Sequence, residues 1–114
     1  MNVHQINRAI NGIILTGTAP DKEYSYAFAS DLMSDVLTLD VDDGLILLTG
    51  LSTTQTIRTA EMSNVSCVVI ARGKRVTNEM IRLAEENDIA LISCTSSLYG
   101  VSGKLFENGI KPVY

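Results

Sequence analysis

The stretch LILLTGLSTTQTIRT, residues 45–59, predicts a strand that runs into a helix through a glycine and three hydroxyl side chains. The same order recurs from SCVVIA, residues 66–71, and from IALISC, residues 89–94, each followed by a helical pattern. Strand starts about 20 residues apart with helices between them indicate parallel βαβ crossovers. We therefore predict an α/β fold of three layers, in which a largely parallel sheet built from βα units carries helices on both faces.

A helix and a strand are expected at the start of the chain. Val3, Ile6 and Ile10 share one helical face, and Gly12 follows where a left-handed cap falls. The run IILTG, residues 13–17, then predicts a strand that ends in a polar loop.

A second strand and a helix are expected before the βα block. In YSYAFAS, residues 24–30, bulky Tyr24, Tyr26 and Phe28 alternate with small residues, which is the period of a strand with one aromatic face. We expect this aromatic face in the core; the alternative is a self-association surface. SDLMSDVL, residues 30–37, predicts a helix with Ser30 as its N-cap.

The composition bounds the class of protein. A chain of 114 residues, 46% hydrophobic and 19% charged, suits one globular domain, residues 1–114, in which the helix and strands of 1–44 precede the block at 45–114. The net charge is -4, and the basic residues are dispersed except in RGKR, residues 72–75, so we expect no nucleic-acid partner. The apolar runs are too short to span a bilayer and no signal peptide is visible, which predicts a cytoplasmic protein that does not bind membranes.

Candidate binding residues follow the predicted strands. The carboxyl ends of parallel strands meet at one edge of a sheet, where ligands usually bind, and helix N-termini there favour anions. The candidate ligand-binding residues are Gly50, Ser52, Thr53, Thr54, Arg72, Gly73, Lys74, Thr95 and Ser96.

Ordinary helix capping explains much of the same pattern. Ser52 and Gln55 have the spacing of a capping box, and Thr77, with either Thr95 or Ser96, suits the next two helix starts. We favour capping over ligand contact.

Catalytic and metal-binding patterns are not evident. The chain has neither a Walker A loop nor a G-x-G-x-x-G after a strand. Asp40, Asp42 and Asp43 do not match a calcium loop and are interpreted as a turn, and the single histidine, His4, as a surface residue. Cys67 and Cys94 lie in or beside apolar runs, and we favour buried thiols over redox chemistry. We predict no catalytic residue, no metal and no cofactor.

Residues 45–105 resemble a DRTGG domain, with LTG at the first strand end, NV before CVVI, and LAEENDIALIS. The segment at 26–37 resembles what precedes this block in small, free-standing members. The resemblance implies a fold like the N-terminal domain of HPr kinase/phosphorylase, and a regulatory or dimer-forming role, as in the DRTGG modules of certain inorganic pyrophosphatases and phosphotransacetylases. Relatives near iron-only hydrogenase genes imply an anaerobic, hydrogenase-linked context. Of the residues that name the family, only Gly73 matches, and a turn role is what it implies there.

The leading hypothesis is a non-catalytic regulatory or sensory domain that acts by self-association, as a homodimer, or through a protein partner. The alternative is a sensor of a nucleotide or phosphorylated metabolite at the strand-end edge. An enzyme ranks last.

Overall fold

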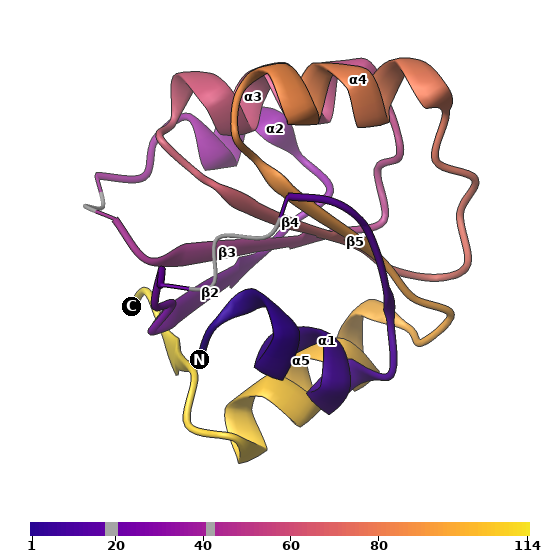
Figure 1. The fold of residues 1–114 in the computed structure, drawn as a ribbon. Helices are drawn as coiled ribbons and strands as arrows, with labels where there is room; N and C mark the ends of the chain where they lie inside the picture. Colours follow the sequence, from indigo (N-terminus) through magenta and orange to yellow (C-terminus); the bar gives the residue numbers. More distant parts are fainter. Residues whose placement is uncertain (18–20, 41–42) are drawn as a thin grey trace.

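The computed structural model describes residues 1–17, 21–40 and 43–114, and within them it places six strands in one sheet, in the order β1-β5-β4-β3-β2-β6 (Figure 1). The central strands pair in parallel, as the recurring unit predicts. They are β2 (Tyr26–Ala29), β3 (Leu45–Thr49), β4 (Cys67–Ile70) and β5 (Ala90–Ser93).

Two strands from near the ends of the sequence form the edges of the sheet. β1 (Ile13–Thr16) pairs antiparallel with β5, and β6 (Lys111–Pro112) pairs in parallel with the start of β2. Because Pro112 has no N–H to donate, an edge is where a strand tolerates it. The sequence did not predict β6, since two residues are too few to show a period.

Helices cover both faces of the sheet, which confirms the three-layer prediction. One face carries α1 (Val3–Ile10) and α5 (Leu98–Glu107), and the opposite face carries α2 (Met33–Val36), α3 (Thr54–Met62) and α4 (Asn78–Glu86) (Figure 1). No helix within the described residues is long and apolar enough to cross a membrane.

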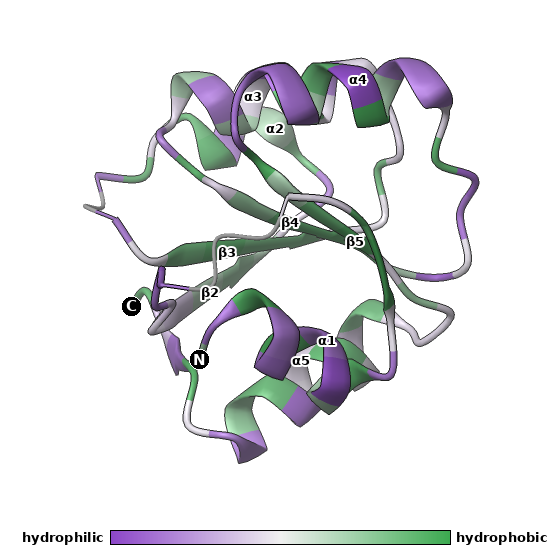
Figure 2. Ribbon diagram, viewed as in Figure 1, coloured by the Kyte–Doolittle hydropathy of each residue, from purple (hydrophilic) through white to green (hydrophobic). Residues whose placement is uncertain are grey.

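The core is divided by the sheet into two hydrophobic clusters. Along β3, Ile46 and Leu48 pack with α1 and α5, whereas Leu45 and Leu47 pack under α2, α3 and α4. Strands covered on both faces are expected to be continuously apolar, and Figure 2 shows the hydrophobic residues concentrated along them. Burial on both faces therefore explains why the strand runs at 45–49, 67–70 and 90–93 lack polar alternation.

The aromatic residues at 24–28 do not form one face, contrary to the prediction. The strand begins only at Tyr26, which is 44% exposed, and Phe28 packs against the cluster under α3 and α4. Tyr24 lies before the strand and is buried in the other cluster, on the side of α1 and α5. The two-residue alternation was wrong here because Tyr24 is outside the regular strand.

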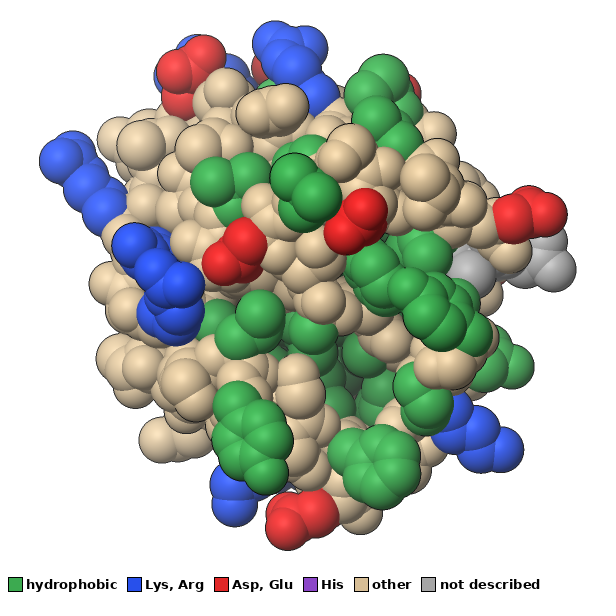
Figure 3. Space-filling model, turned by 180° about the vertical axis from the view of Figure 1, so that it is seen from behind, with side chains coloured by type: hydrophobic (Ala, Val, Ile, Leu, Met, Phe, Trp, Pro, Cys, Tyr) green, Lys and Arg blue, Asp and Glu red, His purple; other side chains and the backbone are tan. Residues whose placement is uncertain are grey.

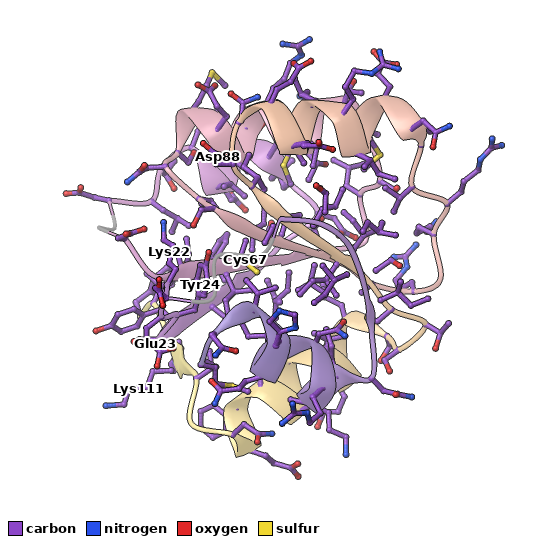
Figure 4. The ribbon with its side chains drawn as sticks, viewed as in Figure 1. Lys22, Glu23, Tyr24, Cys67, Asp88 and Lys111 are labelled. Atoms are coloured by element: carbon purple, nitrogen blue, oxygen red, sulfur yellow. The ribbon has the colours of Figure 1, made fainter. Side chains whose placement is uncertain are left out.

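Tyr24 ties the segment before β2 to the segment before β4. Its hydroxyl lies 2.9 Å from Ser66 Oγ and 3.3 Å from the Ser66 carbonyl oxygen, and burial raises the pKa of Tyr24 to about 12. Figure 4 shows the ring next to Cys67, with Lys22 and Glu23 on the outer side. The phenol is therefore a buried structural group.

Several helix ends lie one or two residues from their predicted positions. Asn11, with φ of 54°, takes the left-handed position that was predicted for Gly12. Ser97 caps α5 by accepting from Gly100 N at 3.0 Å, so the predicted Thr95 or Ser96 cap is wrong. Thr77 caps α4, as predicted. Ser30 instead accepts from Leu32 N, ahead of the short α2.

Candidate functional site

The turns after β3, β4 and β5 meet at the carboxyl edge of the sheet. The backbone N–H of Arg72 donates to the Ser96 carbonyl oxygen at 2.8 Å, which joins the second turn to the third. The Arg72 side chain lies against Gly50, where an added Cβ would stand 3.2 Å from Arg72 Cδ and Nε. The structure thus brings together Gly50, Arg72 and Ser96, three of the predicted site residues.

Asp31 joins this group from the end of β2, and the sequence did not predict it as a site residue. Its Oδ1 accepts from Gly50 N at 2.6 Å and from Thr49 Oγ1 at 3.0 Å. Its Oδ2 lies 3.6 Å from Arg72 Nη1. A carboxylate therefore already occupies the position in which the Gly50 N–H and the Arg72 guanidinium would meet an anion.

The turn at Arg72 and Gly73 uses its amide groups internally. Both residues have positive φ, 70° and 65°, a conformation that glycine adopts without strain and arginine does not. The N–H of Gly73 donates to the Cys94 carbonyl oxygen at 2.9 Å, so neither amide of this turn is left for a ligand. The turn role implied for Gly73 fits this geometry. What the turn offers to solvent is the exposed side chains of Arg72, Lys74 and Arg75.

The start of α3 differs from the predicted capping box. Thr53, and not Ser52, is the N-cap, and its Oγ1 accepts from Thr56 N at 3.3 Å. Ser52 Oγ donates instead to the Arg75 carbonyl oxygen, across to the turn after β4. The capping-box explanation that we favoured for Ser52 and Gln55 is therefore wrong, and Ser52 links two turns of the candidate site.

The remaining predicted residues lie at the rim of the edge. Thr54 is half-buried as the first residue of α3, whereas Lys74 and Thr95 are exposed. The candidate site is thus a polar surface around the Asp31–Arg72 pair.

Thiol and metal chemistry find little support in the described part of the chain. Burial raises the pKa of Cys67 to about 12 and also raises the pKa of Cys94, so both remain thiols near neutral pH.

No three His, Cys, Asp or Glu side chains of the described residues gather as around a metal ion. In the acidic turn, Asp43 pairs with Lys22 at 2.8 Å, which lowers the pKa of that carboxyl. Asp42 of that turn lies outside the described residues.

An apolar pocket lies away from the strand-end edge. It has a volume of about 280 Å³ and opens between β2, α5 and the segment from Ile110 to Tyr114. Ala27 and Ala29 line it with small side chains, and Phe106 lines it as well. The alternation of small residues in β2 was the sequence signal for this hollow, but it did not predict a pocket.

Comparisons with known proteins agree with this fold. A crystal structure of the CBS and DRTGG domains of the regulatory region of Clostridium perfringens pyrophosphatase, complexed with the activator diadenosine tetraphosphate, is similar with a TM-score of 0.71. Sequence identity is 16%, and the similarity covers 91% of this chain but 45% of the solved chain, less than half of its length. No family model matches, and neither does any curated protein. At this identity the likeness shows the fold, and it confirms the DRTGG-like fold that the sequence resemblance predicted.

Proposed function

We propose that residues 1–114 form one non-catalytic regulatory domain that acts by self-association or through a protein partner. The observation that carries this proposal is the fold, which is shared with part of the regulatory region of a pyrophosphatase. The hydrogenase-linked context stays a prediction from the sequence resemblance.

The chemistry of the strand-end edge supports a regulatory role over a catalytic one. A catalytic acid, base or nucleophile needs a reactive protonation state and access to substrate. Here the Asp31 carboxylate is engaged by Gly50, Thr49 and Arg72, and both cysteines are buried as thiols. The Asp31 carboxylate thus has structural partners that account for it, and the two thiols are not exposed to a substrate.

Sedimentation velocity over a range from low to high micromolar protein tests the self-association. We expect a concentration-dependent dimer. A chain that stays monomeric at high micromolar concentration would contradict this part of the proposal.

A second candidate function is a sensor of a nucleotide or another phosphorylated metabolite at the strand-end edge. It is favoured by the nucleotide activator bound to the protein of the same fold. In this chain, Arg72, Lys74 and Arg75 present three exposed cations in one turn, beside Ser96. A phosphate there would compete with the Asp31 carboxylate for the Arg72 guanidinium. The positive charges of Lys74 and Arg75 would supply the rest of its electrostatic attraction.

Thermal unfolding with diadenosine tetraphosphate and with simple nucleotides tests the sensor function. Ligand at 100 times its Kd stabilises a fold by about 2.7 kcal/mol, which is a large shift in melting temperature. The shift should be lost in Lys74→Gln and Arg72→Gln and kept in Lys104→Gln, since Lys104 lies on α5. Absence of a shift at millimolar ligand would remove this candidate.

A further inference from the structure

The outer side of α5 carries two exposed aromatic rings. Tyr99 is 89% exposed and Phe106 is 69% exposed, and their spacing of seven residues places them on one side of the helix. Between them, Gly100, Ser102 and Gly103 leave a shallow hollow, which Lys104 and Glu107 border. Exposed rings beside a hollow are typical of a surface that another protein covers.

The protein's own fold gives no reason for the glycine at position 103. Gly103 lies inside a ten-residue helix, its φ is not positive, and a Cβ added there would meet no atom within 4 Å. A glycine in a helix interior costs about 1 kcal/mol relative to alanine. Its absent side chain leaves room for something that approaches α5 from outside.

The apolar pocket beside β2 continues this surface. Ser102 and Phe106 border both the hollow and the pocket, and Tyr114, 89% exposed, also lines the pocket. Figure 3 shows hydrophobic side chains gathered around a hollow on the side of the molecule that faces away in Figure 1. At about 200 Å² a ring, the exposed parts of Tyr99, Phe106 and Tyr114 offer roughly 500 Å². A stable interface buries about 800 Å² on each partner, so these rings supply more than half of it.

We propose that this surface, the outer side of α5 with the adjoining pocket, pairs with the same surface of a second copy, the two α5 helices crossing antiparallel at Gly103. The inference rests on the proposed self-association and names its surface. A two-fold interface must be complementary to itself, so a projecting group of one copy must face a hollow of the other. With residue 103 opposite residue 103, Phe106 meets Gly100 of the second copy, so a projecting ring faces a small-residue hollow.

The polar groups of the surface fit the same register. Tyr99 comes opposite Glu107 of the second copy, which places a phenol donor beside a carboxylate acceptor. Lys104 comes opposite Ser102, so no two like charges face each other directly. A small molecule or another protein in the pocket would not require this register.

Disulfide crosslinking of the full chain tests the register. Cys67 and Cys94 are both buried, so a cysteine introduced on the surface is the reactive one. Gly103→Cys should form a crosslinked dimer under mild oxidation, because residue 103 faces itself across the axis and a disulfide needs Cα atoms only about 6 Å apart. Glu79→Cys, on α4 beyond the sheet, is the matched control and should not crosslink. Equal crosslinking of the two variants would overturn the register.

Sedimentation velocity of surface variants tests the interface itself. Gly103→Gln places a side chain over the hollow, and its Cβ meets no atom of its own chain within 4 Å. Phe106→Gln removes the projecting ring. Each variant should weaken dimerisation by at least about tenfold. Met62→Gln, at a residue 64% exposed on α3, should leave it unchanged. A wild-type dimer that persists unchanged in both α5 variants would overturn this surface and leave self-association standing. A wild-type monomer at high micromolar protein would overturn both.

Discussion

Replacing Asp31 with alanine should destabilise the fold, because it removes the shared acceptor of two donors at the strand-end edge. The carboxylate accepts from Gly50 N at 2.6 Å and from Thr49 Oγ1 at 3.0 Å, and both donor residues are buried. A buried donor that loses its acceptor costs about 1–3 kcal/mol. Because the Asp31 side chain is 46% exposed, water will replace part of each bond, and the lower end of that range applies. At about 1 kcal/mol for each of the two donors, the expected loss is about 2 kcal/mol.

The ion pair with Arg72 should contribute much less than these hydrogen bonds. The two charged groups stand 3.6 Å apart and are both about half exposed, and such pairs contribute about 0–1 kcal/mol. Arg72→Gln should therefore cost less than Asp31→Ala. Asp31→Asn, which keeps an oxygen acceptor, should fall between them.

Urea unfolding followed by circular dichroism measures these differences, with Asp35→Ala as the control. Asp35 is an exposed carboxylate in α2, and its removal should cost less than about 0.5 kcal/mol. For a chain of this length, 2 kcal/mol corresponds to a fall in melting temperature of roughly 8 °C. If Asp31→Ala is no more destabilising than Asp35→Ala, the hydrogen bonds do not hold the edge together. If Arg72→Gln costs as much as Asp31→Ala, the ion pair dominates and the reasoning is wrong.

Three further predictions follow from the buried phenol, the helix cap and the strained turn. The pKa of Tyr24 is about 12 in the folded state and about 10 in the unfolded state. The unfolded chain therefore loses the phenol proton first as the pH rises. The free energy of unfolding should fall between these two pH values, by up to about 3 kcal/mol. Tyr24→Phe should flatten this pH dependence in urea titrations, and an unchanged slope would contradict the assignment. Thr53→Ala should lower the free energy of unfolding by about 1 kcal/mol, and Gln55→Ala should leave it almost unchanged. A capping box of Ser52 and Gln55 would give the opposite result, a loss at Gln55 and none at Thr53. Arg72→Gly should have a melting temperature no lower than that of the wild type. Glycine adopts the left-handed backbone at position 72 without strain, and this gain offsets the lost ion pair. A clearly lower melting temperature would show that the guanidinium contributes more than the strain costs.

The sequence predicted the part of the fold that repeats. The strands at 45–49, 67–70 and 90–93 are buried on both faces, so their apolar runs are visible without knowledge of their neighbours. The edge strand β6 was missed because its two residues carry no period. The position of Tyr24 was predicted on the wrong face for a related reason, since alternation holds only within a regular strand.

The candidate site was predicted only in outline. Parallel strand ends were sufficient to bring Gly50, Arg72 and Ser96 to one edge, but the role of Asp31 depends on β2 lying next to β3, which no local pattern reports. Whether Ser52 or Thr53 caps α3 depends on which of the two hydroxyls forms a hydrogen bond with another turn. Here Ser52 Oγ donates to the Arg75 carbonyl oxygen, and Thr53 is the cap. Such contacts between distant segments are outside the reach of spacing arguments.

The pairing of β1 and β6 with strands far along the chain has a consequence for the order of folding. β3, β4 and β5 are joined by single helical crossovers, whereas β1 must find β5, and β6 must find β2, across most of the sequence. Closing long loops costs entropy before the contacts repay it, so the two edges should dock after the central strands have formed. Amide hydrogen exchange should then be slowest in β3 and β4 and fastest at the edges. The edge strands β1 and β6 would thus open locally while the central strands stay paired.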